Sequence, residues 1–552
     1  MPRMHFVLVL HAHLPYVLNH GQWPHGTDWL AEATVDCYLP LVETLGRLGA
    51  PGSAPVTLSI TPVLAAQMAA PEFATVVTSF LAQRIEGCEE SARWHAASGE
   101  HDLARIAHWW RNWYLARLAQ FEALDGGLIG ALRDLEWQGR VELMSSAATH
   151  GFLPLLACDE SVNLQLLLGR AEHERVFGRA PTGCWLPECA YRPAGEWNPW
   201  PGAPAVPKRE GIETPLAHAG YRFVVVDSHL AAAGQPLEAY GQPKRSARWR
   251  VERSPYRDVS IGEGPHAIRV LVRDPVSTHH VWSRDFGYPG GAAYREFHKM
   301  TFPGGLRLWS VTHPKAALDD KLRYDPAAAH ALAAEHARHF AGTLEHLARQ
   351  AAPGDSAIVA PFDAELFGHW WFEGPPFLEH LFAELTRRDM SGAPVARCAR
   401  AHVHATDGLA EPLRLSAGSW GRDGDFSYWL NAKTAWTWER LWALEGRFWA
   451  AARRALAWPG MRDVLAQATR EFLLAQSSDW QFMISAGAVP DYAAERFEFH
   501  ASAAEDLLRA LEPGGDLDAG AARAAELRLR DGIFPNVLDS VEAALQATSV
   551  VP

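Results

Sequence analysis

The sequence has little cysteine, no long apolar run and no excess of positive charge. Its six cysteines include no CxxC pair, and scattered cysteines in a long chain are typical of a reducing cytoplasm. No stretch approaches the ~20 apolar residues that a membrane-spanning helix needs. The apolar run Phe6–Leu10 is too short for the core of a secretion signal. We therefore expect a soluble, cytoplasmic protein without a membrane partner.

The charge balance excludes further classes of partner. The formal net charge is −13, whereas nucleic-acid binders carry a basic face and anionic membrane surfaces attract basic segments. A neutral substrate fits better, and neither a nucleic-acid partner nor a cofactor is expected. The sequence leaves the oligomeric state open and is compatible with a monomer.

Tryptophan is the residue type in excess, with 23 Trp against 12 Tyr. A flat apolar ring with one N–H suits the C–H face of a sugar, although most of these side chains are expected to fill the core. The spacing of Trp438, Trp442 and Trp449 marks one face of a helix and indicates packing.

The first half of the chain alternates short apolar runs with helical patterns, which predicts an α/β fold with a parallel sheet. Seven such strands suit a closed or nearly closed barrel. Most are followed by polar or turn residues, and the carboxyl ends of parallel barrel strands are where active sites are built. The predicted strands are Phe6–Leu10, Val56–Ile60, Val141–Met144, Gly183–Leu186, Phe223–Val226, Ile268–Val272 and Ser356–Pro361.

A chain of 552 residues is expected to form two or three domains. We assign residues 1–61 and 139–399 to the barrel and residues 62–138 to a helical insert. Residues 400–552 are predicted to form a C-terminal helical domain, with helices at Leu441–Ala457, Met461–Ala475, Ala503–Leu511 and Ala521–Leu529. The Pro- and Gly-rich stretch Arg192–Glu210 predicts an irregular loop.

Two segments place a carboxylate among aromatic residues at the end of a predicted strand. Glu188 lies in Trp185–Tyr191 and Asp363 lies in Ala360–Trp371. A carboxylate beside such rings is costly to bury unless it is paired or functional. If the two face one cleft, they supply the two carboxylates of a retaining glycosidase; otherwise they are unrelated, solvated strand ends.

The surroundings suggest which carboxylate has which role. A nucleophile must stay ionised and benefits from hydrogen-bond donors, and Glu188 has Tyr191 and Arg192 nearby. A general acid must hold its proton, which the aromatic residues near Asp363 favour. Glu188 is therefore the predicted nucleophile and Asp363 the predicted acid/base, with Glu365 as the competing acid.

His11 and His13 end the first strand, and period-two alternation places both rings on one face. Hydrogen bonding to a polar substrate is the favoured interpretation. The alternative is a zinc site, which would need further ligands at recognisable spacing. We predict no metal here, although His150, Asp227, His279 and His280 are available as further ligands.

Five short motifs give the chain a specific resemblance to glycoside hydrolase family 57, and within it to the 1,4-alpha-glucan branching enzymes. The resemblance implies an incomplete (β/α)7 barrel with a helical insert and a C-terminal helical domain. It also implies Glu188 as nucleophile and Asp363 as acid/base, without a metal. The motifs are Leu10–Tyr16, Val141–Leu143 with Thr149–Gly151, Trp185–Tyr191, Ala360–Trp371 and Ala475–Trp480.

The resemblance further implies a set of substrate-binding residues around the cleft. Asp479 is either a polar partner in the cleft or the N-cap of a helix. Tyr240 corresponds to a tyrosine at the tip of a loop over the site, although the loop 231–260 is longer and more basic than expected. The remaining implied residues are His11, His13, Trp23, His150, Trp282, Trp420 and Trp429.

The expected activity is that of a 1,4-alpha-glucan branching enzyme acting in glycogen-type synthesis. It would cut an α-1,4 link of amylose or glycogen and transfer the chain to a 6-hydroxyl. The nearest alternatives are a hydrolysing alpha-amylase and a 4-alpha-glucanotransferase on the same scaffold. More distant ones are a zinc-dependent hydrolase built on His11 and His13 and a non-catalytic glucan-binding protein.

Overall fold

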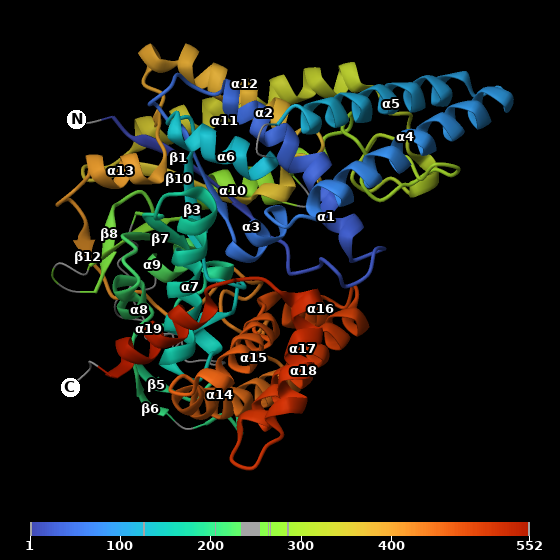
Figure 1. The fold of residues 1–552 in the computed structure, drawn as a ribbon. Coiled ribbons are helices and arrows are strands. Elements are labelled where there is room, and N and C mark those ends of the chain that lie inside the picture. The colour runs from blue at the N-terminus through green and yellow to red at the C-terminus, as the bar shows by residue number, and fades with distance from the viewer. Residues whose placement is uncertain are drawn as a thin grey trace.

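A parallel sheet that curls into an incomplete barrel forms the centre of the molecule (Figure 1). The computed structural model describes residues 3–124, 127–204, 206–232, 254–262, 264, 267–283 and 286–549. Seven strands pair in parallel in the order β10-β1-β2-β3-β4-β7-β9. Their bounds are β1 His5–Ala12, β2 Val56–Ile60, β3 Glu142–Ser146, β4 Gly183–Trp185, β7 Phe223–Val226, β9 Ile268–Val272 and β10 Ala357–Asp363.

The two ends of this curled sheet meet. Arg273, directly after β9, forms a parallel bridge with Val359 of β10, and the Asp274 N–H donates to the Val359 carbonyl at 2.8 Å. All seven predicted strands are confirmed, and those at Val56–Ile60, Phe223–Val226 and Ile268–Val272 match residue for residue. The agreement follows from burial on both faces, which makes parallel strands continuous apolar runs.

The sheet is extended by strands that the sequence did not predict. β8 (Val259–Ile261) pairs antiparallel with β9, and β12 (Glu411–Pro412) pairs with β8. β11 (Val395–Ala396) pairs with β1. The complete sheet is therefore mixed. Inside the barrel the strands pack a small apolar cluster that includes Val7, Val9, Met144, Trp185, Phe223, Val225, Leu271 and Val359.

Helices cover the outer face of the barrel, and local sequence fixes where several of them begin. The Asp274 carboxylate caps α10 (Pro275–Trp282), and Asp325 caps α11 (Pro326–Gln350). Gly169 brings one helix close to the sheet, because a Cβ there would lie 2.3 Å from the Ser146 carbonyl oxygen. The other covering helices are α1 Thr27–Ala33, α2 Leu39–Arg47, α7 Asp159–Phe177, α8 Glu213–His218, α9 Ser228–Ala232, α12 Gly374–Arg387 and α13 Ala399–Ala405.

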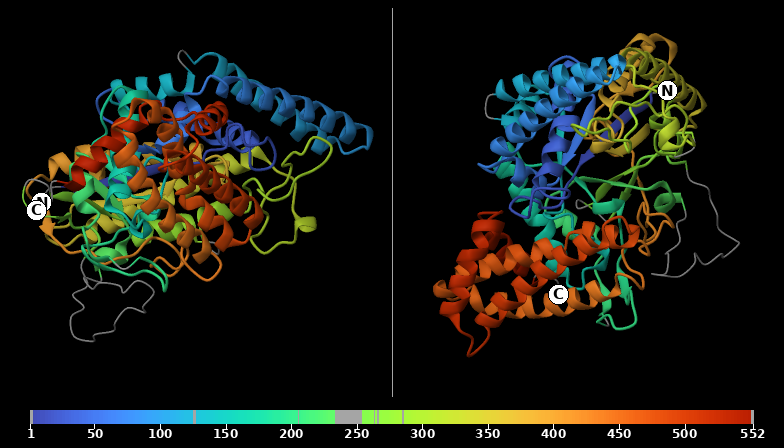
Figure 2. Two further views of the ribbon diagram at one scale, coloured as in Figure 1. Left: turned by 60° about the horizontal axis from the view of Figure 1, so that its bottom comes forward. Right: turned by 90° about the vertical axis from the view of Figure 1, so that its right-hand side faces the viewer.

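The described residues of the predicted insert form helices joined by short turns, and two long helices form a hairpin that projects from the barrel (Figure 2). The helices are α3 Pro62–Met68, α4 Phe73–Ala97, α5 His101–Glu122 and α6 Gly127–Trp137. That the insert, residues 62–138, is a separate domain stays a prediction. Among the described residues no single helix meets the length and apolarity needed to cross a membrane; only α3 and α4 together, as a bent pair, meet them.

The C-terminal region forms a bundle of helices below the barrel (Figure 2). The four predicted helices are present, and α16 and α19 were not predicted. The domain boundary at residue 400 stays a prediction, and β12 still belongs to the barrel sheet. The helices are α14 Ala435–Ala455, α15 Arg462–Ala475, α16 Ser478–Ala486, α17 Pro490–Leu511, α18 Leu517–Asp531 and α19 Val537–Ser549.

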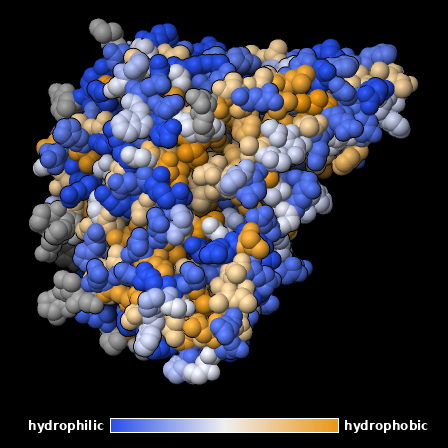
Figure 3. All heavy atoms as spheres, in the orientation of Figure 1, coloured by the Kyte–Doolittle hydropathy of each residue, from blue (hydrophilic) through white to orange (hydrophobic). Residues whose placement is uncertain are grey.

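The surface is indented between the projecting α4–α5 hairpin and the C-terminal helices, and apolar residues line part of this face (Figure 3). Beside the bundle, the prediction of an irregular loop over Arg192–Glu210 is only partly right, because two short strands interrupt it. The stretch contains an antiparallel pair, β5 (Gly195–Trp197) and β6 (Val206–Arg209). Buried Trp197 anchors it by donating its indole N–H to the Pro154 carbonyl at 2.9 Å. This long-range contact cannot be read from the Pro- and Gly-rich composition.

Candidate active site

The polar ends of neighbouring barrel strands lie at one level. The register places His11 of β1 beside Asp363 of β10 on one side and beside Ser59 of β2 on the other. Parallel strands present their carboxyl ends at the same edge of a barrel. The sequence prediction that these residues converge is therefore realised in the geometry.

Glu188 stands in a tight turn directly after β4. Its backbone adopts φ 60° and ψ 23°, and the next residue, Cys189, has φ 48°. Two consecutive non-glycine residues in the left-handed region store conformational strain of a kind that clusters at functional sites. The turn holds the Glu188 side chain in the barrel mouth, where 13 % of it is exposed.

Both carboxylate oxygens of Glu188 accept a hydrogen bond from the C-terminal part of the chain. The Trp420 indole N–H donates to Oε2 at 2.8 Å, and the Ser478 hydroxyl donates to Oε1 at 2.9 Å. The Trp420 backbone N–H also donates to the Glu188 carbonyl at 3.0 Å. These contacts fix the orientation of the carboxylate.

Burial raises the pKa of Glu188 to about 7, and the negative charges of Asp479 and Asp363 act in the same direction. The hydrogen bonds from Trp420 and Ser478 oppose the shift because they stabilise the ionised form. A carboxylate that titrates near neutrality in a cleft is a candidate functional group.

Asp363 ends β10, and its pKa is also raised to about 7, first by burial and then by the negative charge of Glu365. Arg273 and His13 oppose this shift. No hydrogen bond from any described residue reaches the Asp363 carboxylate. Hydrogen-bond donors favour the ionised form of Glu188, and among the described residues Asp363 has no such donors.

Glu365 is differently engaged. Its Oε1 accepts a hydrogen bond from the Tyr38 hydroxyl at 2.6 Å and another from the His13 backbone N–H at 3.0 Å. Burial raises the pKa of Glu365 to about 7. Tyr38 lies in a single turn of π-helix, Thr34–Tyr38, a distortion that is frequent at functional sites.

Two histidines and two serines form a hydrogen-bonded chain that ends at Glu188. His11 Nδ1 lies 3.0 Å from Ser59 Oγ, His11 Nε2 lies 3.1 Å from His150 Nε2, and His150 Nδ1 lies 2.9 Å from Ser478 Oγ. Because Ser478 gives its hydrogen to Glu188, the His150 Nδ1–H must donate to Ser478. His150 Nε2 then accepts from His11, and His11 Nδ1 accepts from Ser59.

Both rings of this chain are neutral. Burial lowers the pKa of His11 and of His150 well below the ordinary value, and neighbouring imidazoles lower both further. The lowered pKa values agree with the donor and acceptor roles given above, because a neutral imidazole carries one N–H and one lone pair on its two nitrogens.

His13 pairs with Asp479, which lies in the first turn of α16, at 2.9 Å. Burial lowers the pKa of His13, but the charge and hydrogen bond of Asp479 outweigh it and raise the pKa above its ordinary value. Burial raises the pKa of Asp479, but His13 outweighs it and lowers the pKa to about 2. The N-cap of α16 is Ser477, so Asp479 is the polar partner and not the cap.

A second network holds the ring of Trp420. The ring centroid lies 5.3 Å from that of Trp185, and the Arg273 guanidinium lies over the Trp420 ring at 5.3 Å. Arg273 pairs with Asp227 at 2.9 Å, and Asp227 also contacts His229 at 3.2 Å. The indole N–H is thereby aimed at Glu188.

Comparison with known proteins places the chain in a family. A model of glycosyl hydrolase family 57 matches residues 7–395, and a model described as 1,4-alpha-glucan branching enzyme, C-terminal, matches residues 443–541. The chain belongs to glycosyl hydrolase family 57. The first match covers the barrel with Glu188 and Asp363, and the second lies within the C-terminal helices.

The similar proteins include enzymes whose names state two different activities. The 1,4-alpha-glucan branching enzyme of Thermococcus kodakarensis is 37% identical over 501 residues, which cover 90% of this chain and 72% of that protein. The crystal structure of the family 57 branching enzyme from that archaeon aligns with a TM-score of 0.86 at 34% identity, covering 98% and 96% of the two chains. The crystal structure of the alpha-amylase AmyC of Thermotoga maritima aligns with a TM-score of 0.80 at 26% identity, covering 98% of this chain and 99% of that one.

The other predicted binding residues of this family 57 chain lie in different environments. Trp23 is 81% exposed, and Trp282 is half-buried with its ring 6.4 Å from Trp370. Trp429 is only 1% exposed and stacks on Phe152 at 4.6 Å, so the structure places it in the core. Tyr240 lies outside the described residues. Their roles in substrate binding stay predictions.

The prediction that Tyr191 and Arg192 supply hydrogen-bond donors to Glu188 is wrong. The Tyr191 hydroxyl donates to Glu213 at 2.6 Å, and Arg192 donates to the Glu210 carbonyl at 2.8 Å. The actual donors are Trp420 and Ser478, from distant parts of the chain. The only sequence feature that pointed to Ser478 was its place in the motif Ala475–Trp480. No sequence pattern indicated that Ser59 or Tyr38 belongs to the site.

Among the described residues, His13, His150 and Asp479 each place one potential metal ligand atom within 4.8 Å of the others. These atoms already have protein partners. His13 Nε2 bonds to Asp479, and the two nitrogens of His150 bond to His11 and Ser478. A zinc ion would have to replace these bonds, so the donor set fits a hydrogen-bonding site better than a metal centre.

Proposed function

We propose that this member of family 57 is a 1,4-alpha-glucan branching enzyme that uses a retaining mechanism. The match of residues 443–541 to the branching-enzyme C-terminal model supports the activity. The observation that carries the mechanism is the Glu188 carboxylate, held by Ser478 and Trp420 in the same barrel mouth as Asp363. The substrate is then an α-1,4-glucan such as amylose or glycogen.

Glu188 is the proposed nucleophile, and Asp363 is the proposed acid/base. Two donated hydrogen bonds favour the ionised form of Glu188, whereas Asp363 has no such donor among the described residues and lies near the negative charge of Glu365. A proton shared between the pair therefore resides on Asp363. Glu365 is the weaker candidate for the acid because Tyr38 and the His13 backbone already occupy its oxygen.

The reaction proceeds in two displacements. The Glu188 carboxylate attacks the anomeric carbon while Asp363 gives its proton to the departing glycosidic oxygen, so the α-1,4 bond breaks and a glycosyl ester forms. Asp363, now ionised, then removes the proton from the 6-hydroxyl of a second glucan. That oxygen attacks the anomeric carbon, releases Glu188 and forms the α-1,6 bond.

Branching and hydrolysis differ only in the acceptor of the glycosyl ester. The residues proposed to guide an acceptor glucan into the cleft are the predicted aromatic platforms, including Trp420 and the half-buried Trp282. His11, His13, His150 and Asp479 are proposed to contact the hydroxyl groups of the bound sugar. A bound acceptor close to the ester gains the rate advantage of proximity over water.

The decisive experiment is incubation of the full chain with linear amylose, followed by enzymatic debranching and chain-length analysis. New α-1,6 links, seen as short chains released only by the debranching enzyme, are the expected result. The variant Glu188→Gln should form none. Reducing sugar without any new α-1,6 link would instead assign a hydrolase.

An alpha-amylase is the second candidate, because AmyC of Thermotoga maritima shares the fold at 26% identity. The ratio of α-1,6 links formed to reducing ends released separates the two activities. A ratio well above one identifies transfer as the main reaction, and a ratio near zero identifies hydrolysis.

We also infer that the enzyme works in a reducing cytoplasm, in glycogen-type synthesis. All six cysteines are free, and five of them are buried. Buried free thiols are typical of proteins that fold where disulfides do not persist. Fractionation of the native cells checks the compartment, and loss of branched glucan on gene deletion checks the pathway.

A further inference from the structure

A large cavity opens at the end of the barrel opposite the proposed active site. Its volume is about 930 Å³, which is near the upper end for small-molecule sites. Its lining includes residues that lie just before barrel strands: Ala54 before β2, Gly139 before β3, Thr182 before β4 and Arg222 before β7. The cavity therefore lies at the amino ends of the strands, whereas Glu188 and Asp363 lie at the carboxyl ends.

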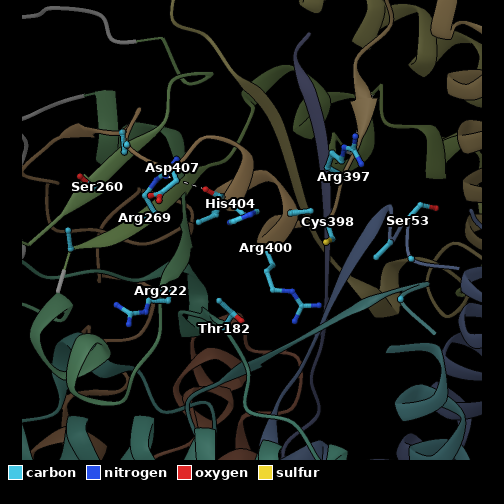
Figure 4. Close-up of a pocket in the computed structure, with 18 of the residues that line it drawn as sticks. Ser53, Thr182, Arg222, Ser260, Arg269, Arg397, Cys398, Arg400, His404 and Asp407 are labelled. Atoms are coloured by element: carbon cyan, nitrogen blue, oxygen red, sulfur yellow. Dashed lines mark hydrogen bonds between the residues drawn. The ribbon is translucent and has the colours of Figure 1, made fainter. Parts of the chain in front are cut away.

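The cavity is basic in an acidic protein. Four arginines line it, and Asp407 is the one acidic residue among the described lining residues, although the chain as a whole carries a net charge of −13. The arginines are Arg222, Arg269, Arg397 and Arg400. In Figure 4, Arg397 lies just before α13 and Arg400 lies within it, whereas Thr182 and Arg222 lie directly before β4 and β7.

The arginines differ in how far they are already engaged. Arg269 is buried and tied to Asp258 at 3.2 Å and to the Thr406 hydroxyl at 2.8 Å, so it is a fixed part of the wall. The Arg400 guanidinium lies 3.9 Å from Glu136, at the limit of an ion pair. Among the described residues, the Arg397 guanidinium forms no hydrogen bond or ion pair. Arg397 and Arg400 thus retain donors for a ligand.

The lining argues for an anion rather than a sugar. Apart from His404, no ring side chain is found among the described lining residues, so the cavity lacks the tryptophan platforms on which glucans stack. Guanidinium groups bind phosphate with paired, charge-assisted hydrogen bonds. Ser53, Thr182 and Ser260 add hydroxyl groups to the lining.

We propose that this cavity binds a small molecule carrying a phosphate or diphosphate group, with Arg397 and Arg400 as its main ligands. Both residues are anchored through their backbones to barrel strands. The Arg397 N–H donates to the Phe6 carbonyl of β1 at 3.0 Å, and the Arg400 N–H donates to Glu142 Oε2 of β3 at 2.8 Å. The site is built on rigid elements and is independent of the proposed glucan chemistry.

The test is isothermal titration of the full chain with sodium pyrophosphate at constant ionic strength, alongside inorganic phosphate. Saturable binding with a single site is expected, together with a rise in the unfolding temperature in the presence of pyrophosphate. The double variant R397Q/R400Q should weaken pyrophosphate binding at least about tenfold, because it removes the charge-assisted hydrogen-bond donors of both side chains.

The matched control is R447Q/R509Q, which removes two exposed arginines of α14 and α17 far along the chain from the cavity. Its affinity for pyrophosphate should equal that of the unmodified chain. The variant R397K/R400K keeps both charges without the planar fork and should bind with intermediate affinity. Circular dichroism of R397Q/R400Q establishes that the fold is intact.

Two results would overturn the proposal. One is the absence of saturable binding of either probe by the unmodified chain at millimolar concentration. The other is equal binding by R397Q/R400Q and R447Q/R509Q, which would assign the signal to general electrostatic attraction. Neither result bears on branching activity, which the amylose experiment measures separately.

Discussion

The Ser478 hydroxyl donates a hydrogen bond to Glu188 Oε1 at 2.9 Å, although the two residues are 290 positions apart in the chain. Ser478 begins α16 in the C-terminal helices, and Glu188 follows β4 in the barrel. The proposed catalytic end of the barrel is therefore completed by a side chain from the C-terminal helices. Behind Ser478, the chain of His150, His11 and Ser59 fixes the direction of each hydrogen bond.

Substitution of the two proposed catalytic carboxylates should abolish both transfer and hydrolysis. Glu188→Gln removes the nucleophile and Asp363→Asn removes the proton donor, so each should lower kcat at least about 10³-fold on amylose. The control Glu495→Gln changes an exposed residue of α17 and should be as active as the unmodified chain. An active Glu188→Gln enzyme would contradict the assignment of the nucleophile.

Ser478→Ala should lower kcat by roughly 10- to 100-fold without preventing folding. The Ser478 hydrogen bond lowers the pKa of Glu188, so its loss should raise that pKa and move the acidic limb of the pH–rate profile to higher pH. Ser478→Thr keeps a hydroxyl and should restore most of the activity. A purely structural role would change the unfolding temperature but leave the acidic limb in place.

The pH profile of kcat/KM should be bell-shaped, with its maximum close to neutrality. The proposed mechanism needs Glu188 ionised and Asp363 protonated, and burial raises the pKa of each to about 7. Mutual repulsion makes the two protons leave in separate steps, which gives a rising and a falling limb. A maximum below pH 5 would show that the carboxylates titrate as exposed groups.

Glu365→Gln tests the source of the raised pKa at Asp363. The negative charge of Glu365 raises the pKa of Asp363, so its removal should lower that pKa and move the basic limb to lower pH. Glutamine keeps the oxygen that accepts from Tyr38 and the His13 backbone. If Glu365 were itself the acid, the variant would lose activity at every pH instead of shifting the profile.

The ion pair between His13 and Asp479 should make stability depend on pH in a defined window. The lowered pKa of Asp479, about 2, contributes stability above its unfolded value of 3.8 that is lost as the pH falls towards 2. The raised pKa of His13 contributes stability below 6.5 that is lost as the pH rises through its folded value. The pair therefore stabilises the fold most between about pH 4 and 6.5.

Asp479→Asn should consequently lower the unfolding temperature most within that window, and less as the pH falls towards 2 or rises through the raised pKa of His13. Thermal unfolding followed by circular dichroism across this range measures the difference from the unmodified chain. Asp491→Asn, at an exposed position in α17, is the matched control and should show no such pH dependence. A constant difference at all pH values would show that the pair is not ionised as described.

Much of the barrel could be predicted from sequence because its physics is local. Strands such as Val56–Ile60 and Phe223–Val226 are buried on both faces and so appear as short apolar runs. The strand-end positions of His11, Glu188 and Asp363 followed from the same pattern, and parallel strands bring such ends together. Strands β8, β11 and β12 were not predicted, because they are very short and form only through pairing with other strands.

The amino-acid sequence by itself determined the strand pattern, the helical character of the insert and C-terminal region, and the two carboxylates that face the barrel mouth. Only the tertiary structure decided which groups touch those carboxylates. Trp420 and Ser478 replace the nearby Tyr191 and Arg192 as donors to Glu188, and Asp479 pairs with His13 instead of capping its own helix. Hydrogen bonds depend on the distance and angle between two groups in space. Closeness of two residues in the sequence does not determine either quantity.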